Sequence, residues 1–429
     1  MTALNEKQRA EILDAVSQTV VRRFYDPQLR GVDWNAAVAR HRNDIVTAPS
    51  AEAFESSISK LLCELKTSHM GFYHRALERT TSKMAISATY AAFPVDGNEC
   101  WVFQDVHPGG AAHLAGIRSG DILVSVGGRH FAPPENPIFP MGRKVELKVI
   151  TSGYQAEFRL VDVPPPTRKR NQLPYAQPNL VTGRRVRDDT GYIRISMYPG
   201  MIGIEVAKEI SSTVAALSPI ERLILDLRGN TGGGIGVLRV MSLLTPERIP
   251  VGYSLERGQL ETVHKVDRSL VFDRIPAKKR DLLPMAFKFL LFPWLFKPAG
   301  QKKFITLATE GLGHQTFQGR IVLLVNRHTA SANEMLVAFA KENRLATIVG
   351  EATPGRLLAG NKFKLPHGYW LALPVGVYHT ASGTLLEGTP IIPDIEISFD
   401  PRQARDGRDT QLEKAIEIVS ELRAFLDQR

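Results

Sequence analysis

Ser331 is the residue whose surroundings in the sequence first suggest chemistry. It follows an apolar run, residues 319–326, and a short loop, and it opens the amphipathic segment 331–342. A serine at the start of a helix lies where backbone N–H groups point outward, so an oxyanion formed there would be stabilised. A plainer role is also available, because Ser331 and Glu334 have the spacing of a capping box. Spacing alone favours the cap.

A glycine-rich stretch, DLRGNTGGG at 226–234, follows a second apolar run. Glycines let backbone amides approach a bound group closely, and successive amides in such a turn can bind a phosphate or an oxyanion. The stretch has neither GxGxxG nor a following GKS or GKT, so it is a poor nucleotide-binding loop. Residues 350–356 mimic the spacing of a phosphate-binding loop, but Arg356 stands in place of its lysine.

Two histidines and one glutamate are candidate partners of Ser331. Ser68 and His69 lie in a break after an N-terminal helical segment, where a lone histidine is usually a surface or structurally satisfied residue. His328 competes with His69 because it is near Ser331 in the sequence, although that does not aim its ring at the hydroxyl. Glu387 lies in a glycine-flanked loop, where a carboxylate either orients an imidazole or is a solvated turn residue.

The elements that must position these residues begin with a helical domain expected over residues 1–80. Apolar residues recur at helical spacing within 12–21 and again within 51–66. The sequence TSHMGF at 67–72 then breaks the pattern, and its glycine and small polar residues predict a loop. The polar N-terminus lacks the apolar core of a secretory signal.

Residues 84–163 read as a β-rich domain, with short β-branched runs separated by glycine and proline. Within it, VHPGGAAHLAGIRSGDILVSVGG at 106–128 resembles the central part of a PDZ domain, with glycines where a turn, a helix cap and a strand entry require them. PDZ domains bind an extended C-terminal peptide as an added strand. The resemblance therefore implies substrate binding by this domain, with Gly109 and Gly110 as the candidate residues.

Residues 190–429 form the third expected unit, after a proline-rich and basic linker over 164–189. Apolar runs alternate there with amphipathic segments, which predicts an α/β core with crossover connections. A long insertion over 245–318 interrupts the alternation, and its centre, 275–303, combines basic residues with large apolar ones. A lid over the active site or an oligomer contact is expected, with a satellite core or contact with an anionic membrane as alternatives.

Composition excludes several classes of protein. The chain has 429 residues, of which 43% are hydrophobic and 23% charged, so wholesale disorder is ruled out. Two cysteines cannot form a disulfide framework or a CxxC zinc site, and they suit a cytoplasmic location. The net charge of +10 suits nucleic acid, an anionic membrane surface or acidic peptides. Because RNP, helix-turn-helix and zinc-finger signatures are missing, no nucleic-acid partner is expected.

Four motifs that follow one another in the sequence favour a catalytic role for Ser331 over a purely structural one. They are DLRGNTGGG, VNRHTASANEM, TIVGEATPG and LLEGTPIIPDIEI. With the helical and PDZ-like segments before them, they resemble the family of C-terminal processing peptidases and tricorn-core-like serine peptidases. The resemblance covers residues 30–397 apart from the insertion. It implies an α/β and α+β multidomain protein, with an N-terminal helical domain, a PDZ-like domain and a ClpP- and crotonase-like catalytic core.

The family resemblance also selects between two catalytic forms. The Ser–Lys form has a lysine where Arg356 stands, and its supporting glutamine is replaced by Gly360. Arginine stays protonated in proteins and cannot act as a general base. The tricorn-type Ser–His–Glu form remains, and it implies Ser331 as nucleophile, His69 as base, and Glu387 orienting the imidazole directly or through Ser68.

Further implications of the resemblance concern the oxyanion and the partners. The expected oxyanion donors are backbone N–H groups of Gly232, Gly233, Gly234 and Ala332. No metal or organic cofactor is needed, and the expected partner is a peptide or protein substrate. Arg356 is expected either to bind a substrate carboxylate or to cap a loop, and the chain is a candidate homo-oligomer. The alternative function is a catalytically inactive peptide- or ligand-binding protein on the same scaffold.

Overall fold

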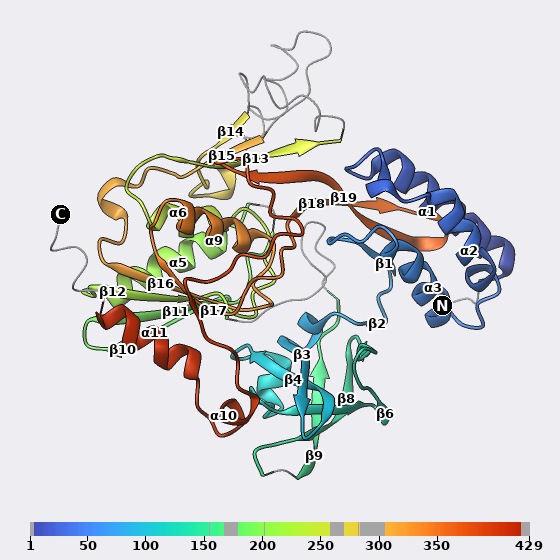
Figure 1. The fold of residues 1–429 in the computed structure, drawn as a ribbon, viewed down its shortest axis with the longest axis horizontal. Helices are drawn as coiled ribbons and strands as arrows, with labels where there is room; N and C mark the ends of the chain where they lie inside the picture. Colours follow the sequence, from blue (N-terminus) through green and yellow to red (C-terminus); the bar gives the residue numbers. More distant parts are fainter. Residues whose placement is uncertain are drawn as a thin grey trace, which may run out of the picture.

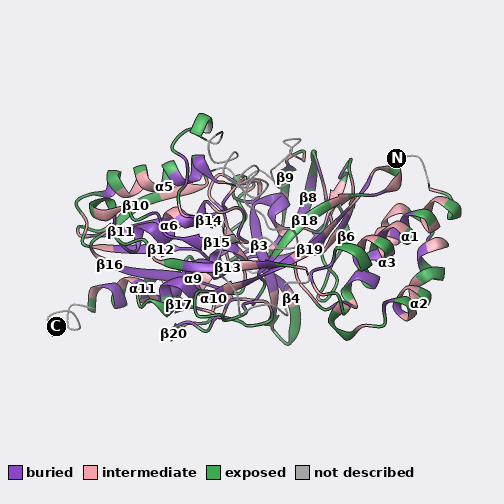
Figure 2. Cartoon of the chain, turned by 90° about the horizontal axis from the view of Figure 1, so that it is seen from above, coloured by how far each residue is buried: buried purple, intermediate pink, exposed green. Residues whose placement is uncertain are grey.

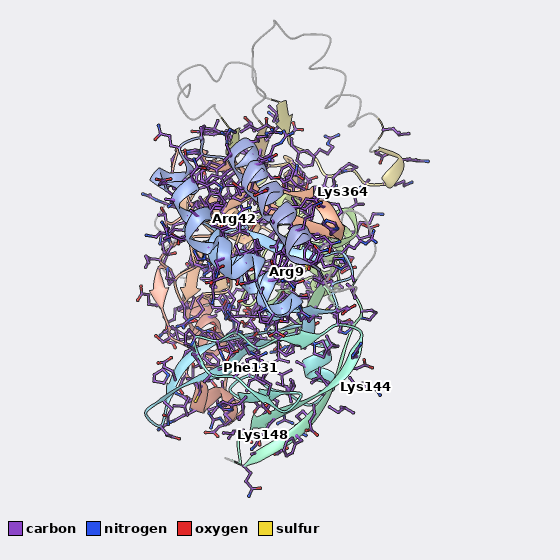
Figure 3. All side chains as sticks on the ribbon, turned by 90° about the vertical axis from the view of Figure 1, so that its right-hand side faces the viewer. Arg9, Arg42, Phe131, Lys144, Lys148 and Lys364 are labelled. Atoms are coloured by element: carbon purple, nitrogen blue, oxygen red, sulfur yellow. The ribbon has the colours of Figure 1, made fainter. Side chains whose placement is uncertain are left out.

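The computed structural model describes residues 4–153, 155–166, 179–200, 202–257, 270–281, 283 and 305–421. Three parts are visible in these residues (Figure 1): N-terminal helices, a small β domain, and an α/β core to which the C-terminal helices return. Figure 3 shows the N-terminal helices, marked by Arg9 and Arg42, above the β domain, marked by Phe131, Lys144 and Lys148.

The N-terminal helices share a hydrophobic core with a long hairpin of the main body. The elements are α1 (Glu6–Arg23), η1 (Leu29–Gly31), α2 (Trp34–Val46), α3 (Ala51–Cys63) and β1 (Gly71–His74). Their apolar faces pack on β18 (Leu358–Lys364), η5 (Pro366–Gly368) and β19 (Tyr369–Thr380). The first 80 residues are therefore not purely helical, because β1 pairs with β19 in antiparallel register. This pairing anchors the chain directly after His69.

The β domain is an antiparallel sheet in the order β3-β4-β5-β8-β9. Its elements are β2 (Arg79–Thr80), η2 (Lys83–Ile86), β3 (Ala88–Val95), β4 (Asn98–Val106), α4 (Ala111–Leu114), β5 (Ile122–Val126), β6 (Arg129–His130), β7 (Phe139–Pro140), β8 (Arg143–Ile150) and β9 (Ala156–Val163). Tyr90, Phe103 and Phe139 fill its core. The C-terminal helix α10 (Pro401–Arg405) packs closely against Gly120, where a Cβ atom would lie 2.4 Å from the Arg405 nitrogen.

The core sheet runs in the order β10-β11-β12-β16-β17-β20, and all its pairings are parallel except that of β10 with β11. Its strands are β10 (Val181–Arg187), β11 (Thr190–Ile195), β12 (Arg222–Asp226), β16 (Arg320–Val325), β17 (Thr347–Gly350) and β20 (Ile395–Glu396). Residues 181–187 were expected in the linker, but they form the edge strand β10. Their sequence, VTGRRVR, has no apolar pattern because this strand is buried on neither face.

Helices cover both faces of this sheet, which explains the continuous apolar runs of its central strands. One face carries α5 (Ile204–Leu217), α6 (Val237–Leu243) and α9 (Ala332–Glu342), and the other carries α11 (Thr410–Glu421). In Figure 2 the strands β12 and β16 are buried, whereas α5 exposes its outer side. Parallel strands place their carboxyl ends at one edge, and the loops that follow β12 and β16 meet there.

The expected insertion over 245–318 contributes to a second sheet, in the order β1-β19-β13-β15-β14 with β18 on β19. Its elements are β13 (Pro250–Glu256), β14 (Leu270–Phe272), η3 (Lys279–Asp281), β15 (Ile305–Ala308) and η4 (Gly313–Gln315). Most of its basic and aromatic centre, at 284–304, lies outside the described residues, so the expectations about a lid, an interface or a membrane contact are not placed. Among the helices described, none is long and apolar enough to cross a membrane.

Candidate active site

Ser331 lies in a sharp turn between β16 and α9. Its backbone has φ 57° and ψ −120°, which is unfavourable for a residue with a side chain and costs about 1–3 kcal/mol. The Ser331 N–H offsets this strain by donating both to the carbonyl oxygen of Arg356, at 3.1 Å, and to Oε2 of Glu334, at 3.1 Å. The turn holds the serine at the start of the helix, beside the glycine loop.

Glu334 ties this turn to the loop that follows β17. Besides the Ser331 N–H, its carboxylate accepts hydrogen bonds from Thr353 Oγ1 (2.8 Å), Gly355 N (2.7 Å) and Arg356 N (2.8 Å). Burial raises the pKa of Glu334, and these hydrogen bonds oppose the rise. Ser331 and Glu334 do form the capping box that the spacing predicts. The cap and a catalytic role for Ser331 are therefore compatible.

The His69 ring bridges two serines. Its Nε2 lies 3.2 Å from Ser331 Oγ, although the two residues are 262 positions apart in the sequence, and its Nδ1 lies 2.7 Å from Ser68 Oγ. His69 also has a positive φ, 59°, in the short link between α3 and β1. The pairing of β1 with β19 fixes where this link ends. The second sheet therefore positions the imidazole beside the turn that holds Ser331.

Glu387 completes the set, and it reaches His69 through Ser68. Its carboxylate accepts from Ser68 N (2.8 Å), Ser68 Oγ (2.8 Å), Thr67 Oγ1 (3.2 Å) and Leu357 N (3.0 Å). An ionised carboxylate only accepts hydrogen bonds, so the Ser68 hydroxyl proton points to Glu387. Ser68 Oγ must then accept from His69 Nδ1–H. This assignment leaves Nε2 unprotonated, facing the Ser331 hydroxyl.

Electrostatics keep the imidazole neutral. Burial lowers the pKa of His69, the nearby charge of Glu387 raises it, and that of Arg356 lowers it further; the net shift is downward. A ring with a pKa below its ordinary value of about 6.5 is unprotonated at neutral pH. It can accept a proton there.

The glycine loop after β12 lies against Ser331 and corrects one expectation. A Cβ atom on Gly232 would lie 2.7 Å from Ser331 Cβ, so only glycine fits. However, the Gly232 N–H already donates to Asn230 Oδ1 (2.9 Å) and the Gly234 N–H to the Tyr198 carbonyl (2.8 Å). Gly232 and Gly234 were therefore wrongly expected as oxyanion donors.

Two of the four expected donors remain, Gly233 and Ala332. Within the described part of the chain, no acceptor occupies the N–H of either residue. Ala332 N lies 3.0 Å from the Cβ position of Gly232, which places this amide directly beside the loop. Free amides in the glycine loop and at the start of α9 suit a developing negative charge on this side of Ser331.

Buried asparagines support the oxyanion side of the site. Asn230 Oδ1 holds Gly232, and its carbonyl oxygen accepts from Asn333 Nδ2 (2.8 Å) and Ala330 N (3.2 Å). Asn326, at the end of β16, accepts at Oδ1 from Gly229 N (3.2 Å) and donates through Nδ2 to Asp105 (2.9 Å). The two asparagines lock the glycine loop to the nucleophile turn.

Asp105 extends this support into the β domain. It lies on β4, is buried, and accepts from Thr89 Oγ1 (2.6 Å) as well as from Asn326. A Cβ atom on Gly229 would lie 2.6 Å from Asp105 Cβ, so the β domain and the glycine loop touch directly. Asp105, Asn230 and Asn326 were not among the expected site residues; the position of Asn326 directly after the buried strand β16 was the available signal for that residue.

A buried ion-pair network fixes the start of the same loop. Arg228 donates to Asp226 (2.7 and 3.0 Å) and to Asp409 (2.7 and 2.8 Å), which belongs to the C-terminal segment before α11. The cations of Arg228 and Arg194 outweigh burial and hold the pKa of Asp226 well below its usual range. Removing one partner from such a network is strongly destabilising, because a buried charge is left uncompensated.

The competing residues do not reach Ser331. His328 donates its backbone N–H to Asn326 (3.0 Å), and burial, with the Lys83 cation, lowers its pKa to about 3. Burial lowers the pKa of Lys83 to about 8, but its amine contacts the Tyr90 carbonyl and lies 4.8 Å from the centre of the Tyr90 ring. Among the described residues, no lysine amine is hydrogen-bonded to Ser331 Oγ. The structure thus offers a histidine, not a lysine, as base.

The remaining site candidates form no hydrogen bond with Ser331 Oγ among the described residues. The Arg356 backbone braces Ser331, and its side chain is exposed. Gly109 and Gly110 form the turn before α4, where Gly109 N donates to His113 Nδ1 (3.3 Å). Substrate binding by these glycines stays a prediction. The described residues hold no group of three or more histidine, cysteine or acidic side chains suited to a metal ion.

Comparison with known proteins identifies the domains. Residues 189–397 match peptidase family S41, and residues 102–137 match the PDZ domain. The chain is 25% identical over 428 residues to a putative tricorn protease homolog 2 of Streptomyces coelicolor, covering 93% of this chain and 31% of that protein. It is 26% identical over 330 residues to a carboxyl-terminal-processing protease of Picosynechococcus, covering 74% and 66%.

The fold agrees with these matches. The photosystem II D1 C-terminal processing protease superposes with a TM-score of 0.56 at 18% identity, covering 96% of this chain and 97% of that one. The chain therefore contains one region that matches the PDZ domain and another that matches peptidase family S41. It spans about a third and two thirds, respectively, of the two relatives named above.

Proposed function

We propose that this protein is a serine endopeptidase that hydrolyses peptide bonds through an acyl-enzyme on Ser331. The observation that carries the proposal is the 3.2 Å separation of His69 Nε2 and Ser331 Oγ, because it unites residues from remote parts of the chain. The Ser68–Glu387 chain behind the ring and the match to peptidase family S41 support it.

The mechanism follows from the hydrogen-bond directions. His69 Nε2 takes the proton of the Ser331 hydroxyl as Oγ attacks the peptide carbonyl carbon. The N–H groups of Gly233 and Ala332 stabilise the oxyanion, and each such donor is worth about 3–4 kcal/mol in the transition state. The imidazolium, stabilised through Ser68 by Glu387, protonates the departing amine. Water then attacks the ester by the same route and frees Ser331.

The PDZ domain is proposed to engage the C-terminus of the substrate. Two observations support this role: its direct contact with the glycine loop through Asp105, and the similarity to a carboxyl-terminal-processing protease. The exposed Arg356 side chain beside the site suits a substrate carboxylate. A cytoplasmic location and a homo-oligomeric state stay predictions; Cys63 and Cys100 are both free thiols.

A fluorophosphonate probe tests the proposal, because it reacts only with an activated serine. We expect rapid labelling of the wild type, none of Ser331→Ala, and strongly slowed labelling of His69→Ala. Ser212→Ala, which removes an exposed hydroxyl on α5, is the matched control and should label normally. Folded wild-type protein that does not label would instead indicate the inactive binding protein.

A further inference from the structure

A cavity of about 800 Å³ lies at the edge of the core sheet opposite to Ser331. It is bounded by α5, by α6 and by the chain that enters β16, and it is bordered by the first residues of β12 and β16, Arg222 and Arg320. The site described above lies beyond the other end of these strands, at least about 16 Å away, since β12 has five residues. The cavity is therefore separate from the peptidase site.

The lining combines an apolar wall with arginines. Side chains of Val214, Ile220, Leu243, Leu312 and Phe317 supply the wall. A volume in this range suits a small organic ligand. Such a ligand would bury apolar surface there and would also meet the charges at the strand ends.

Those charges are unevenly compensated. Arg222 and Arg320 are paired in register on adjacent parallel strands, so their side chains leave the sheet on the same face. Arg222 forms an ion pair with Asp189. Arg320 forms no ion pair with any described residue, and its Nη1 atom is buried without a hydrogen-bond partner. An arginine that lacks an acidic partner beside an apolar wall is costly, and an anion in the cavity would relieve that cost by compensating its charge.

The other charged groups at the cavity do not meet this need. Arg239 is satisfied by Glu310 (2.6 and 3.1 Å) and by Ser211 Oγ (3.0 Å). Glu221 borders the mouth and is exposed, and it forms no ion pair with Arg320 within the described residues. Its backbone carbonyl instead accepts from Arg320 N at 3.0 Å. Arg320 is thus the cation that a ligand would neutralise.

We propose that this cavity binds a carboxylate carried on a compact apolar body, with Arg320 receiving the carboxylate and α5 and α6 covering the apolar part. The bidentate geometry of a guanidinium suits a carboxylate. Two sources have this chemistry, a free fatty acid and the C-terminus of an apolar peptide. The inference does not depend on the proposed peptidase activity.

Isothermal titration calorimetry on the full chain tests the proposal with two probes and their neutral analogues. Decanoate is compared with decan-1-ol, and N-acetyl-leucyl-phenylalanine with its C-terminal amide. We expect at least one carboxylate to bind at least tenfold more tightly than its analogue, and the tighter probe identifies the source. Arg320→Gln should weaken that binding at least tenfold, and Arg320→Lys should weaken it less.

Control variants keep the test decisive. Ala215→Phe places a bulky group on the cavity wall and should also weaken binding, which covers the case that Arg320→Gln fails to fold. Glu221→Gln and the exposed Arg402→Gln should leave binding within a factor of two. The proposal is overturned if neither carboxylate binds below about millimolar concentration, or if binding survives both Arg320→Gln and Ala215→Phe. Calorimetry measures binding and not peptide hydrolysis. A protein without peptidase activity would therefore give the same outcome in this test.

Discussion

On one side of Ser331 lie the partly exposed side chains of Ser68, His69 and Glu387, whereas the opposite side rests on the fully buried Asn230 and Asn326. On the imidazole side, Ser68 Oγ links His69 to Glu387, and the backbone N–H groups of Ser68 and Leu357 hold the carboxylate; all of these groups belong to loops. The oxyanion side is a network of buried polar groups anchored in both the core sheet and the PDZ domain. The two sides therefore differ in both accessibility and support.

This difference matches the physical demands of the two tasks. A proton-transfer group has to meet substrate and leaving group, so it lies where solvent can reach it. Oxyanion donors contribute most when their dipoles are fixed before the reaction, so that nothing has to reorganise. Networks of buried hydrogen bonds provide such rigidity. Substitutions on the two sides should therefore leave different kinetic signatures.

The largest expected effect is on the imidazole side. His69→Ala should lower kcat for a peptide substrate by roughly 10⁴-fold or more, because the nucleophile loses its base. His328→Gln is the matched control, since that ring is near Ser331 in the sequence but is not hydrogen-bonded to it; it should lose less than about tenfold. Equal losses in steady-state kinetics would contradict the assignment of the base.

The next effect concerns the chain behind the ring. Ser68→Ala and Glu387→Gln should each lower kcat roughly 10–100-fold, because a charge-assisted hydrogen bond that stabilises the imidazolium is weakened. The double variant should lose little more than either single variant, since both break the same chain. Additive losses would show that Glu387 acts independently of Ser68. Thr67→Val, which removes a longer bond to Glu387, serves as the milder comparison.

A smaller effect is expected on the oxyanion side. Asp105→Asn should lower kcat about tenfold with little change in KM, because the support of Asn326 is loosened while the donors remain. The midpoint of the acid limb of the pH profile should stay where it is, since His69 is untouched. Asp96→Asn, an exposed carboxylate of the same domain paired with Arg402, should change neither. An unchanged kcat in Asp105→Asn would remove the PDZ domain from the support of the loop.

The smallest effect is a shift in pH dependence. Because the net shift of the His69 pKa is downward, the acid limb of kcat/KM should have its midpoint below about 6.5. Arg356→Gln removes a cation that lowers this pKa, so the midpoint should move to higher pH. A downward movement would contradict the electrostatic account. Arg344→Gln, an exposed arginine after α9, is the control.

The sequence predicted the imidazole side better than the oxyanion side. Ser331, His69, Ser68 and Glu387 lie in short motifs whose order resembles a known family, and the structure brings them together. The backbone donors were predicted only as a group, because which N–H of a glycine turn is free depends on neighbours such as Tyr198. Asp105 could not be found, because its role arises only from the docking of another domain.

The fold shows the same limit. Buried parallel strands such as β12 and β16 are continuous apolar runs and were readily predicted. Strands β10, β13 and β15 were assigned to a linker or an insertion instead, since edge strands and those of a half-exposed sheet carry mixed polar residues. The partner of β13 on one side, β19, is also distant in the sequence. Local pattern therefore identified the centre of each unit and missed its margins.

The wide separation of the reacting groups has a consequence during synthesis. His69, Ser331 and Glu387 enter the protein in that order, and Asp409, which holds Arg228 below the glycine loop, comes later still. A growing chain on the ribosome thus cannot bring these residues and their support together before Asp409 has emerged. A partly synthesised chain therefore lacks the contact between His69 and Ser331 and the support of the glycine loop.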